Sequence, residues 1–492
     1  MKGKVVLPSV LAIGFTGHRQ LPDEQRSRAQ IAQFLKEKQE NTQGIVYGVS
    51  SAAAGGDLLF AESCIQLGLN LRILLPMPKG QFREDFDEPT WRRVENVLRQ
   101  AMSVEVTGGD QSRDERYYEC GIETVHQSRM LLTLWDGKPS RGLGGTEQIF
   151  KFAELEGRPI VWINSHTGAI QHLNDDKDLL NDPEMEFLNA LPEAEQEPRT
   201  GTPEELAKAW FLKIDTSATN ASPRVRRLAA IPILGTAGAS ILSTIGSIAS
   251  ATGTSIWAGI GSGVGFSVGI LPPLLRMQQG QVFWARTRSA TEICRSNLAF
   301  WKTPTPYNVI GPEFVPELAG MLMSLNFLKM SDGSGSRANL EEFKNDYRME
   351  RVDQQIKYFN EKADLSDRKA KEYGIAIKIS TVIAIIANVA VLLSSFVLKG
   401  KIFTFKSHLL LTGSIFFQIA AIAGAMFVVN DHERRRVRYR ELHDLLREWD
   451  KQLAFAQTWP TLLKIAASVE KALLAEVIEW KSLILHHKLP RR

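Results

Sequence analysis

The stretch Leu11-Ala12-Ile13-Gly14-Phe15-Thr16-Gly17-His18-Arg19 places a short apolar run directly before a turn that contains glycine, histidine and arginine. Such a run is typical of a buried strand, and helix-length polar segments separate it from further short apolar runs. Those runs lie at 45–49, 71–75, 103–106, 130–134 and 160–163. Strands buried on both faces and separated by helices form a parallel doubly wound sheet, so residues 1–170 are predicted to be a Rossmann-like α/β head.

Three Gly-rich turns follow strands of this sheet, where ligands of doubly wound sheets bind. In the first, Gly14–Arg19, Gly17 lets the backbone turn and Arg19 can donate two hydrogen bonds to a phosphate. The second, 50–57, and the third, 142–147, lead into helices, whose N-termini favour anions. One such turn is a weak signal, but three at successive strand ends indicate a phosphate-bearing ligand.

The second half of the chain contains four long apolar segments. Between Arg227 and Arg276 lie 48 consecutive residues without Asp, Glu, Lys or Arg, whereas one bilayer crossing needs about 20 apolar residues. Core helices of soluble proteins usually keep a polar face, and these segments lack a broad one. The sequence therefore predicts an all-α membrane domain with four transmembrane helices and cytosolic helices, the spans being 228–250, 256–275, 379–398 and 409–429.

Lys and Arg beside the spans predict their orientation, because cytoplasmic flanks carry excess positive charge. Four clusters fall on one side, and the loop with Lys399, Lys401 and Lys406 is a smaller contrary signal. Both termini are therefore expected in the cytoplasm. The clusters are Arg224, Arg226 and Arg227; Arg276, Arg286 and Arg288; Arg368, Lys369, Lys371 and Lys378; and Arg434, Arg435, Arg436, Arg438 and Arg440.

Gly261, Gly265 and Gly269 recur at intervals of four in the second span, so they share one helical face on which two backbones can approach closely. This contact lies either within the hairpin or between subunits, and the sequence leaves both open. The expected domains are the head at 1–170, an acidic linker or covering segment at 171–222, a first transmembrane hairpin with a cytosolic helix at 223–302, a linker at 303–339, and a second hairpin with cytosolic helices at 340–485.

Composition limits other classes of function. The net charge is +4, and the excess positive charge lies beside the apolar spans, so nucleic acid is not an expected partner. Cys64, Cys120 and Cys294 lie far apart and lack the spacing of a zinc site or a disulfide framework. The chain has no HExxH, GxSxG or Walker P-loop motif, so neither a catalytic residue, a metal nor a cofactor is assigned.

The cytosolic helices around the last two spans carry a more specific signal. Tyr347–Arg351, Gln354-Gln355 and Tyr358-Phe359 precede the hairpin, and Arg438–Leu442 and Leu474–Trp480 follow it. This layout resembles the SLATT family over about 340–485. The resemblance implies a membrane effector of bacterial conflict systems that are triggered by nucleotides.

Together with Leu134-Trp135-Asp136-Gly137, the three turns resemble the SLOG superfamily over nearly the whole head. That superfamily includes phosphoribohydrolases and sensors of NAD-derived signals, so the resemblance implies a nucleotide ligand. For the basic pair within it, Lys79 and Arg83, a solvated surface is an equal alternative. The implied ligand-binding residues are Gly17, His18, Arg19, Ser51, Gly55, Gly56, Asp57, Lys79, Arg83, Asp136, Gly144, Gly145, Thr146 and Glu147.

One departure from the family favours a sensor over an enzyme. The phosphoribohydrolases that the head resembles carry a catalytic Glu one helical turn after the Gly-Thr pair, where this chain has Ile149 and Phe150. Glu147, which directly follows Thr146, is displaced from that place, and stabilising an oxocarbenium ion requires close geometry. Binding is therefore expected rather than hydrolysis.

The expected function is that of a homo-oligomeric effector in a bacterial inner membrane, acting in antiphage defence. Its head binds a nucleotide second messenger, such as an ADP-ribose derivative or a cyclic nucleotide, and the spans then oligomerise or rearrange to disrupt the bilayer. The alternative is a membrane-anchored nucleotide-processing enzyme. A constitutive ion channel is a weaker third hypothesis, because the spans contain no ionisable residue that would mark an ion path.

Overall fold

The computed structural model describes residues 4–109, 111–140, 142–174, 179, 182–194, 201–221, 238, 280–304, 307, 309–311, 315–332, 339–397 and 403–485. The chain forms two compact units, Met1–Ile214 with Ile293–Ala338 and Asp215–Glu292 with Asn339–Arg492. Apart from residue 238, the expected spans at 228–250 and 256–275 lie outside the described residues. The same holds for Gly261, Gly265 and Gly269, so their proposed contact stays a prediction.

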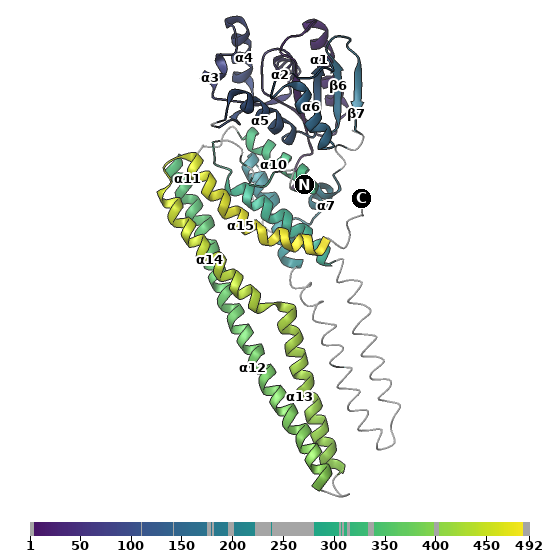
Figure 1. Cartoon of the computed structure of the whole chain (residues 1–492), viewed down its shortest axis with the longest axis vertical. Coiled ribbons are helices and arrows are strands. Elements are labelled where there is room, and N and C mark those ends of the chain that lie inside the picture. The colour runs from purple at the N-terminus through teal and green to yellow at the C-terminus, as the bar shows by residue number, and fades with distance from the viewer. Residues whose placement is uncertain are drawn as a thin grey trace. The chain divides into compact units, whose positions relative to one another are not determined.

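The first unit is built on a seven-stranded sheet of order β4-β3-β2-β1-β5-β6-β7. Figure 1 labels β6 and the edge strand β7, which lie side by side. Strands β1 to β6 pair in parallel, which confirms the six predicted strands, and the edge strand β7 runs antiparallel to β6. Strand β7 has the sequence Ile-Gln-His-Leu and is mostly exposed, so no apolar run predicts it. The strands are β1 (Val10–Gly17), β2 (Ile45–Ser50), β3 (Asn70–Leu75), β4 (Ser103–Val106), β5 (Met130–Trp135), β6 (Ile160–Asn164) and β7 (Ile170–Leu173).

One face of the sheet packs against helices that follow β1, β2 and β3. Alternate residues of β1, among them Ile13 and Phe15, enter a core with Leu35 and Phe60, and the Phe15 and Phe60 rings stack at 4.8 Å between centroids. This alternation follows from the strand period of two. The helices of this face are α1 (Glu24–Asn41), α2 (Gly56–Gln66) and α4 (Glu88–Gln100), with the short α3 (Lys79–Arg83) before α4.

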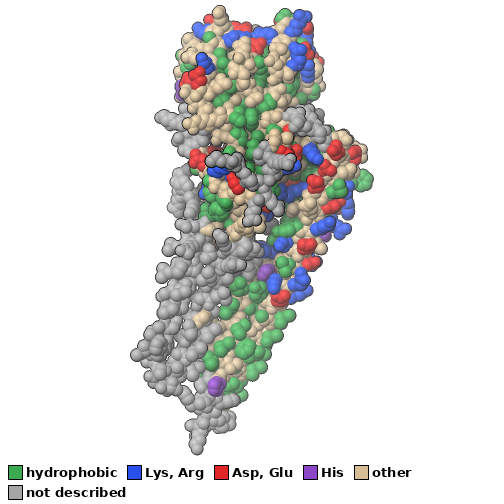
Figure 2. Space-filling view, turned by 180° about the vertical axis from the view of Figure 1, so that it is seen from behind, with side chains coloured by type: hydrophobic (Ala, Val, Ile, Leu, Met, Phe, Trp, Pro, Cys, Tyr) green, Lys and Arg blue, Asp and Glu red, His purple; other side chains and the backbone are tan. Residues whose placement is uncertain are grey.

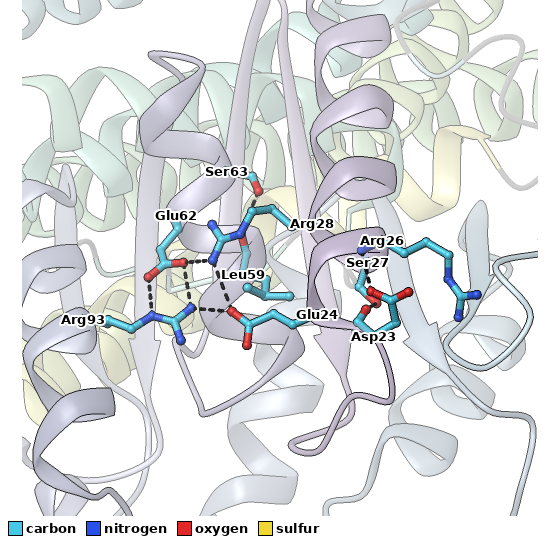
Figure 3. A network of polar contacts seen from close by, with 9 residues as sticks. All are labelled: Asp23, Glu24, Arg26, Ser27, Arg28, Leu59, Glu62, Ser63 and Arg93. Atoms are coloured by element: carbon cyan, nitrogen blue, oxygen red, sulfur yellow. Dashed lines mark hydrogen bonds and ion pairs between the residues drawn. The ribbon is translucent and has the colours of Figure 1, made fainter.

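Ion pairs join α1, α2 and α4 (Figure 3). The Glu62 carboxylate accepts hydrogen bonds from Arg28 at 2.6 Å and Arg93 at 2.8 Å, and Arg93 also reaches Glu24 at 3.1 Å. Partial burial alone would raise the pKa of Glu62, but the two guanidinium groups hold that pKa below its ordinary value. The Glu62 carboxylate of α2 thus forms ion pairs with both α1 and α4.

The opposite face is covered by α5 (Arg113–His126), α6 (Thr146–Leu155) and a helix from much later in the chain, α10 (Ala319–Ser331). Met323 and Phe327 of α10 pack on β1 and β2 around Tyr47. The sequence treats 303–339 as a linker, and the structure differs there. Helix α10 is apolar on nearly all sides and almost wholly buried, so it lacks the polar face that marks a surface helix.

The segment after the sheet also covers the first unit. It contains α7 (Pro183–Asn189) and a helix at 203–221. Lys213 of the later helix is fully buried, and its ammonium donates to the carbonyl oxygens of Val5 at 2.8 Å and Asn189 at 2.9 Å. A third bond, at 3.0 Å, reaches the Glu193 carboxylate, which balances the buried charge.

The second unit is helical in its described part. Helix α12 (Asp353–Val397) and helix α13 (Phe403–Asn430) form an antiparallel hairpin, and α14 (His432–Phe455) returns along the first half of α12 (Figure 1). Two helices are long and apolar enough to cross a membrane, Leu340–Ser394 and His408–Phe455. They contain residues 379–394 of the third predicted span and the whole of the fourth, 409–429.

The hairpin has a charged end and an apolar end. At the charged end, where α14 packs on α12, Arg436 pairs with Asp367 at 3.3 Å, and the Tyr373 and His432 rings stack at 5.6 Å between centroids. At the apolar end, large apolar side chains such as Ile379 and Ile386 are more than half exposed. Figure 2 shows this change from mixed charges to hydrophobic side chains. Exposed apolar surface of this extent marks a contact with another protein surface or with a membrane.

A buried ion pair joins α15 (Trp459–Leu485) to a π-helical turn (Tyr347–Val352) that follows α11 (Leu340–Asp346). Arg351 donates two hydrogen bonds to Glu470, at 2.8 and 2.7 Å, and the Tyr347 hydroxyl donates to the same carboxylate at 2.9 Å. Because the Glu470 side chain is fully buried, removing one partner leaves a charge without compensation.

We expect Glu470→Ala to lower the free energy of unfolding by about 3–5 kcal/mol, since Arg351 would remain buried and unpaired. Thermal unfolding of the purified full-length protein measures this. The double variant Arg351→Met/Glu470→Leu removes both charges and should cost much less. Equal losses in the two variants would show that shape, rather than charge pairing, governs this contact.

Candidate functional site

The order of the strands reverses between β1 and β5, so the connections that follow these two strands diverge and leave a crevice at their carboxyl ends. Strand β1 ends at Gly17 and β5 at Trp135, and Gly17 is the register partner of Leu134. The first predicted turn and the Asp136-Gly137 connection therefore begin side by side, and the third predicted turn, 142–147, lies further along the connection from β5 to α6. The second turn follows β2, the other neighbour of β1.

Glycines bring the first two turns into direct contact. A Cβ on Gly56 would lie 3.2 Å from the Gly17 Cα, and the Gly56 amide donates to the His18 carbonyl oxygen at 2.9 Å. Gly55 precedes α2 with φ +87°, and a Cβ there would lie 2.4 Å from the carbonyl oxygens of both His18 and Arg19. Only glycine fits this approach.

The buried Asp57 side chain hydrogen-bonds to both of these turns. Its carboxylate accepts the Gly17 amide at 3.2 Å and the Ser51 hydroxyl at 2.8 Å. Burial raises the pKa of Asp57 to about 7, although both hydrogen bonds and the nearby Arg19 charge act to lower it. The structure thus gives Asp57 and Ser51 a role in holding the turns together.

A histidine pairs with a carboxylate across the reversal point. His18 Nε2 lies 2.9 Å from Asp136 Oδ1, and His166 Nε2 lies 3.9 Å from Asp136 Oδ2. Burial alone would raise the pKa of Asp136, but the Lys138 amide and His18 hold that pKa below its ordinary value. The three side chains come from different connections, so no spacing in the sequence predicts this cluster.

The third turn is held by residues of α6. The Glu147 carboxylate accepts the Ser140 amide and the Lys151 ammonium, both at 2.6 Å, and these bonds lower its pKa, the Lys151 bond contributing most. Gln148 accepts the Gly144 amide at 2.7 Å. Glu147 therefore already has partners within its own loop. Gly145 and Thr146 begin α6, and the buried Ser140 hydroxyl beside Gly145 has no hydrogen-bond partner among the described residues.

Tyr117 of α5 connects the first turn with the third. The Arg19 guanidinium lies 4.6 Å from the centre of the Tyr117 ring, and a Cβ on Gly144, at φ +80°, would lie 2.9 Å from the Tyr118 amide nitrogen. The Tyr117 hydroxyl donates to Asp85. Burial, followed by this hydrogen bond, raises the pKa of Tyr117 above its ordinary value. Nothing in the sequence marks Tyr117, because its role depends on α5 reaching this edge of the sheet.

Lys79 and Arg83 lie on α3, and both form ion pairs and cation–π contacts with residues of α4. Lys79 pairs with Glu95 at 2.9 Å and Arg83 with Glu88 at 2.6 Å, and both cations lie over the Trp91 ring. Arg19 differs from this pair, because no carboxylate of the described residues lies within ion-pair distance of it.

The structure therefore brings the predicted residues of the first two turns close to Asp136. Tyr117 contacts both the first turn, through Arg19, and the third turn, through Gly144. The helices α2 and α6 begin without a side-chain cap at Gly55 and Gly145, and the Arg19 guanidinium is exposed, which are features that suit an anion. Within the described ranges, no group of three or more His, Cys, Asp or Glu side chains is arranged to hold a metal ion. No protein-family model matches the chain, and no curated protein matches it.

Gly55→Ala should destabilise the first unit by more than the 1–2 kcal/mol that a positive φ costs an alanine, because its Cβ would also displace the His18 and Arg19 carbonyls. Gly68→Ala is the matched control, since Gly68 has φ +68° and open space around its Cβ position. Chemical unfolding of the two full-length variants compares them. Equal losses would contradict the close approach of the turns.

The raised pKa of Asp57 predicts a pH dependence of stability. Since the folded state holds the proton up to about pH 7 and the unfolded carboxyl releases it near its ordinary pKa of 3.8, stability should fall as pH rises through this window. Asp57→Asn mimics the neutral carboxyl and should flatten this fall. Thermal unfolding between pH 4 and pH 7 measures it, with Glu119→Gln, an exposed carboxylate of α5, as the control. Parallel curves for wild type and Asp57→Asn would exclude the protonated carboxyl.

Proposed function

We propose that this protein is a membrane effector whose α/β head binds a nucleotide through its phosphate groups at the carboxyl ends of β1, β2 and β5. The observation that carries the proposal is Arg19. It is an exposed guanidinium beside two glycine turns, held against Tyr117 and without a carboxylate partner in the described part of the chain. A bidentate donor with an open side, beside helix N-termini that have no side-chain cap, suits a phosphate ligand.

The second half of the proposal concerns the membrane. The two apolar helices of the second unit, together with the 48 uncharged residues before Arg276, support four spans with both termini on the cytoplasmic side. The nucleotide would then act as a second messenger that alters the bilayer, as the resemblance to antiphage effectors implies. An ADP-ribose derivative is the ligand class we favour.

Signalling requires that the ligand bind one arrangement of the head more tightly than another. The contact of Gly17 with Gly56, and of Tyr117 with Arg19, makes the site a junction of three separate connections. A ligand that bridges these connections would stabilise one relative position of α2, α5 and α6. This differential binding is the physical basis that the effector hypothesis needs.

The alternative function, a membrane-anchored nucleotide-processing enzyme, is favoured by a different observation. The His18 imidazole is oriented by the Asp136 carboxylate at 2.9 Å, in the manner of a general acid or base. Glu147, the carboxylate nearest in sequence to the phosphoribohydrolase pattern, is occupied by Ser140 and Lys151. The acid-base pair therefore supports catalysis more than Glu147 does.

Arg19→Ala should weaken nucleotide binding by about 10- to 100-fold, which is the range for losing hydrogen bonds to a charged group. The assay is the ligand-induced thermal shift of the full-length protein in detergent, with ADP-ribose, its cyclic isomers, NAD and cyclic oligonucleotides. Arg92→Ala is the control, because it removes the same charge from an exposed surface ion pair.

Two outcomes would contradict the proposal. Equal shifts for Arg19→Ala and wild type would remove Arg19 from the site. Chromatography of the ligand after incubation separates the two functions, since an intact ligand supports a sensor. Consumption of the ligand that His18→Ala abolishes would instead establish the enzyme.

A further inference from the structure

Asn388 is a polar side chain in the middle of the apolar part of α12. Its Nδ2 donates to the Ala384 carbonyl oxygen at 2.7 Å, and the residue is otherwise exposed. A carboxamide has two donor hydrogens and an acceptor oxygen, so most of its hydrogen-bonding capacity has no partner among the described residues. If α12 crosses a bilayer as proposed above, these groups face hydrocarbon, where an unsatisfied polar group is costly.

The position of Asn388 on the hairpin indicates where its missing partner lies. Ala384 and Ala387 are buried between α12 and α13, and a Cβ on Gly413 of α13 would lie 2.9 Å from Asn388 Nδ2. Asn388 thus lies at the edge of the contact between the helices. Thr381, seven residues earlier, is also exposed and lies two helical turns away on the same side. We call this pair the 381/388 edge.

The sequence limits which groups can satisfy this amide. The spans predicted at 228–250 and 256–275 contain no Asn and no Gln, so their polar side chains are Ser and Thr hydroxyls and the Trp257 indole, without a carboxamide. The other amide in the apolar part of the described hairpin, Gln418, has interactions of its own. A second Asn388 supplies both a donor and an acceptor at the same depth. Identical side chains brought together about a symmetry axis satisfy each other, as buried Asn pairs do in coiled coils.

We propose that the 381/388 edge packs against the same edge of a second copy of this chain within the bilayer, with the Asn388 amides paired across the contact. This inference rests on the proposed membrane function but not on the nucleotide. It goes beyond a general tendency to oligomerise, because it assigns the contact to one edge of one hairpin.

Cysteine cross-linking in membranes tests the contact. The native Cys64, Cys120 and Cys294 are all buried, so an introduced cysteine on the hairpin reacts alone. Full-length Thr381→Cys, oxidised in membranes without nucleotide, should form disulfide-linked dimers. Ile386→Cys is the matched control, because this side chain is 63% exposed but lies on another side of α12. It should form far fewer dimers.

Adding Asn388→Leu to Thr381→Cys should reduce the dimer by about threefold or more, the change that loss of a polar contact between membrane helices brings. Asn388→Gln keeps an amide and should retain most of it. Equal cross-linking at 381 and 386, or no effect of Asn388→Leu, would overturn the proposal. Absence of dimers at 381 would also do so and would assign the amide to a partner within the chain.

Alkaline extraction of the same membranes separates this failure from that of the proposed function. A chain that leaves the membranes contradicts the membrane effector itself. A chain that stays embedded but does not cross-link at 381 contradicts only the contact between copies.

Discussion

The close approach of the Gly17 and Gly56 backbones is the constraint on which the candidate site depends. A Cβ at Gly55 would clash with the His18 and Arg19 carbonyl oxygens at 2.4 Å, and a Cβ at Gly17 or Gly56 would crowd the facing backbone at 3.2–3.3 Å. Separating the β1 and β2 connections would also weaken the bonds of Asp57 to Gly17 and Ser51. The same contact leaves Arg19 exposed beside Tyr117. Space for an anion at this edge of the sheet is therefore a consequence of missing Cβ atoms as much as of charged groups.

One face of the sheet that carries this site is covered by a helix from a distant part of the chain. Helix α10 covers Tyr47 and its neighbours on β1 and β2, and without it those apolar side chains would face water. The head is thus not the continuous segment 1–170, since the first unit includes Ile293–Ala338. The uncharged residues 228–275 lie in the sequence between these two parts of the first unit. The chain therefore connects that apolar stretch to the first unit at both of its ends.

Sequence reasoning identified the turns of the site but not what the turns do. The glycines, Arg19 and Asp136 could be predicted because strand ends and Gly-rich turns are local features. Tyr117 and His166 could not, since each reaches the site through the packing of a separate connection. Asp57 and Glu147 are predicted ligand-binding residues, and the structure shows that their carboxylates are hydrogen-bonded to the turns themselves, which the sequence does not indicate.

The sequence by itself determined the six parallel strands, the helices between them and the two apolar helices of the second unit, because periodicity and hydrophobicity act over a few neighbouring residues. Only the tertiary structure decided the order of the strands, the antiparallel β7 and the place of α10. It also decided the partners of Arg351 and Asn388. These features depend on which surfaces pack together when the chain folds. The local sequence around each residue does not indicate which distant residues it will contact.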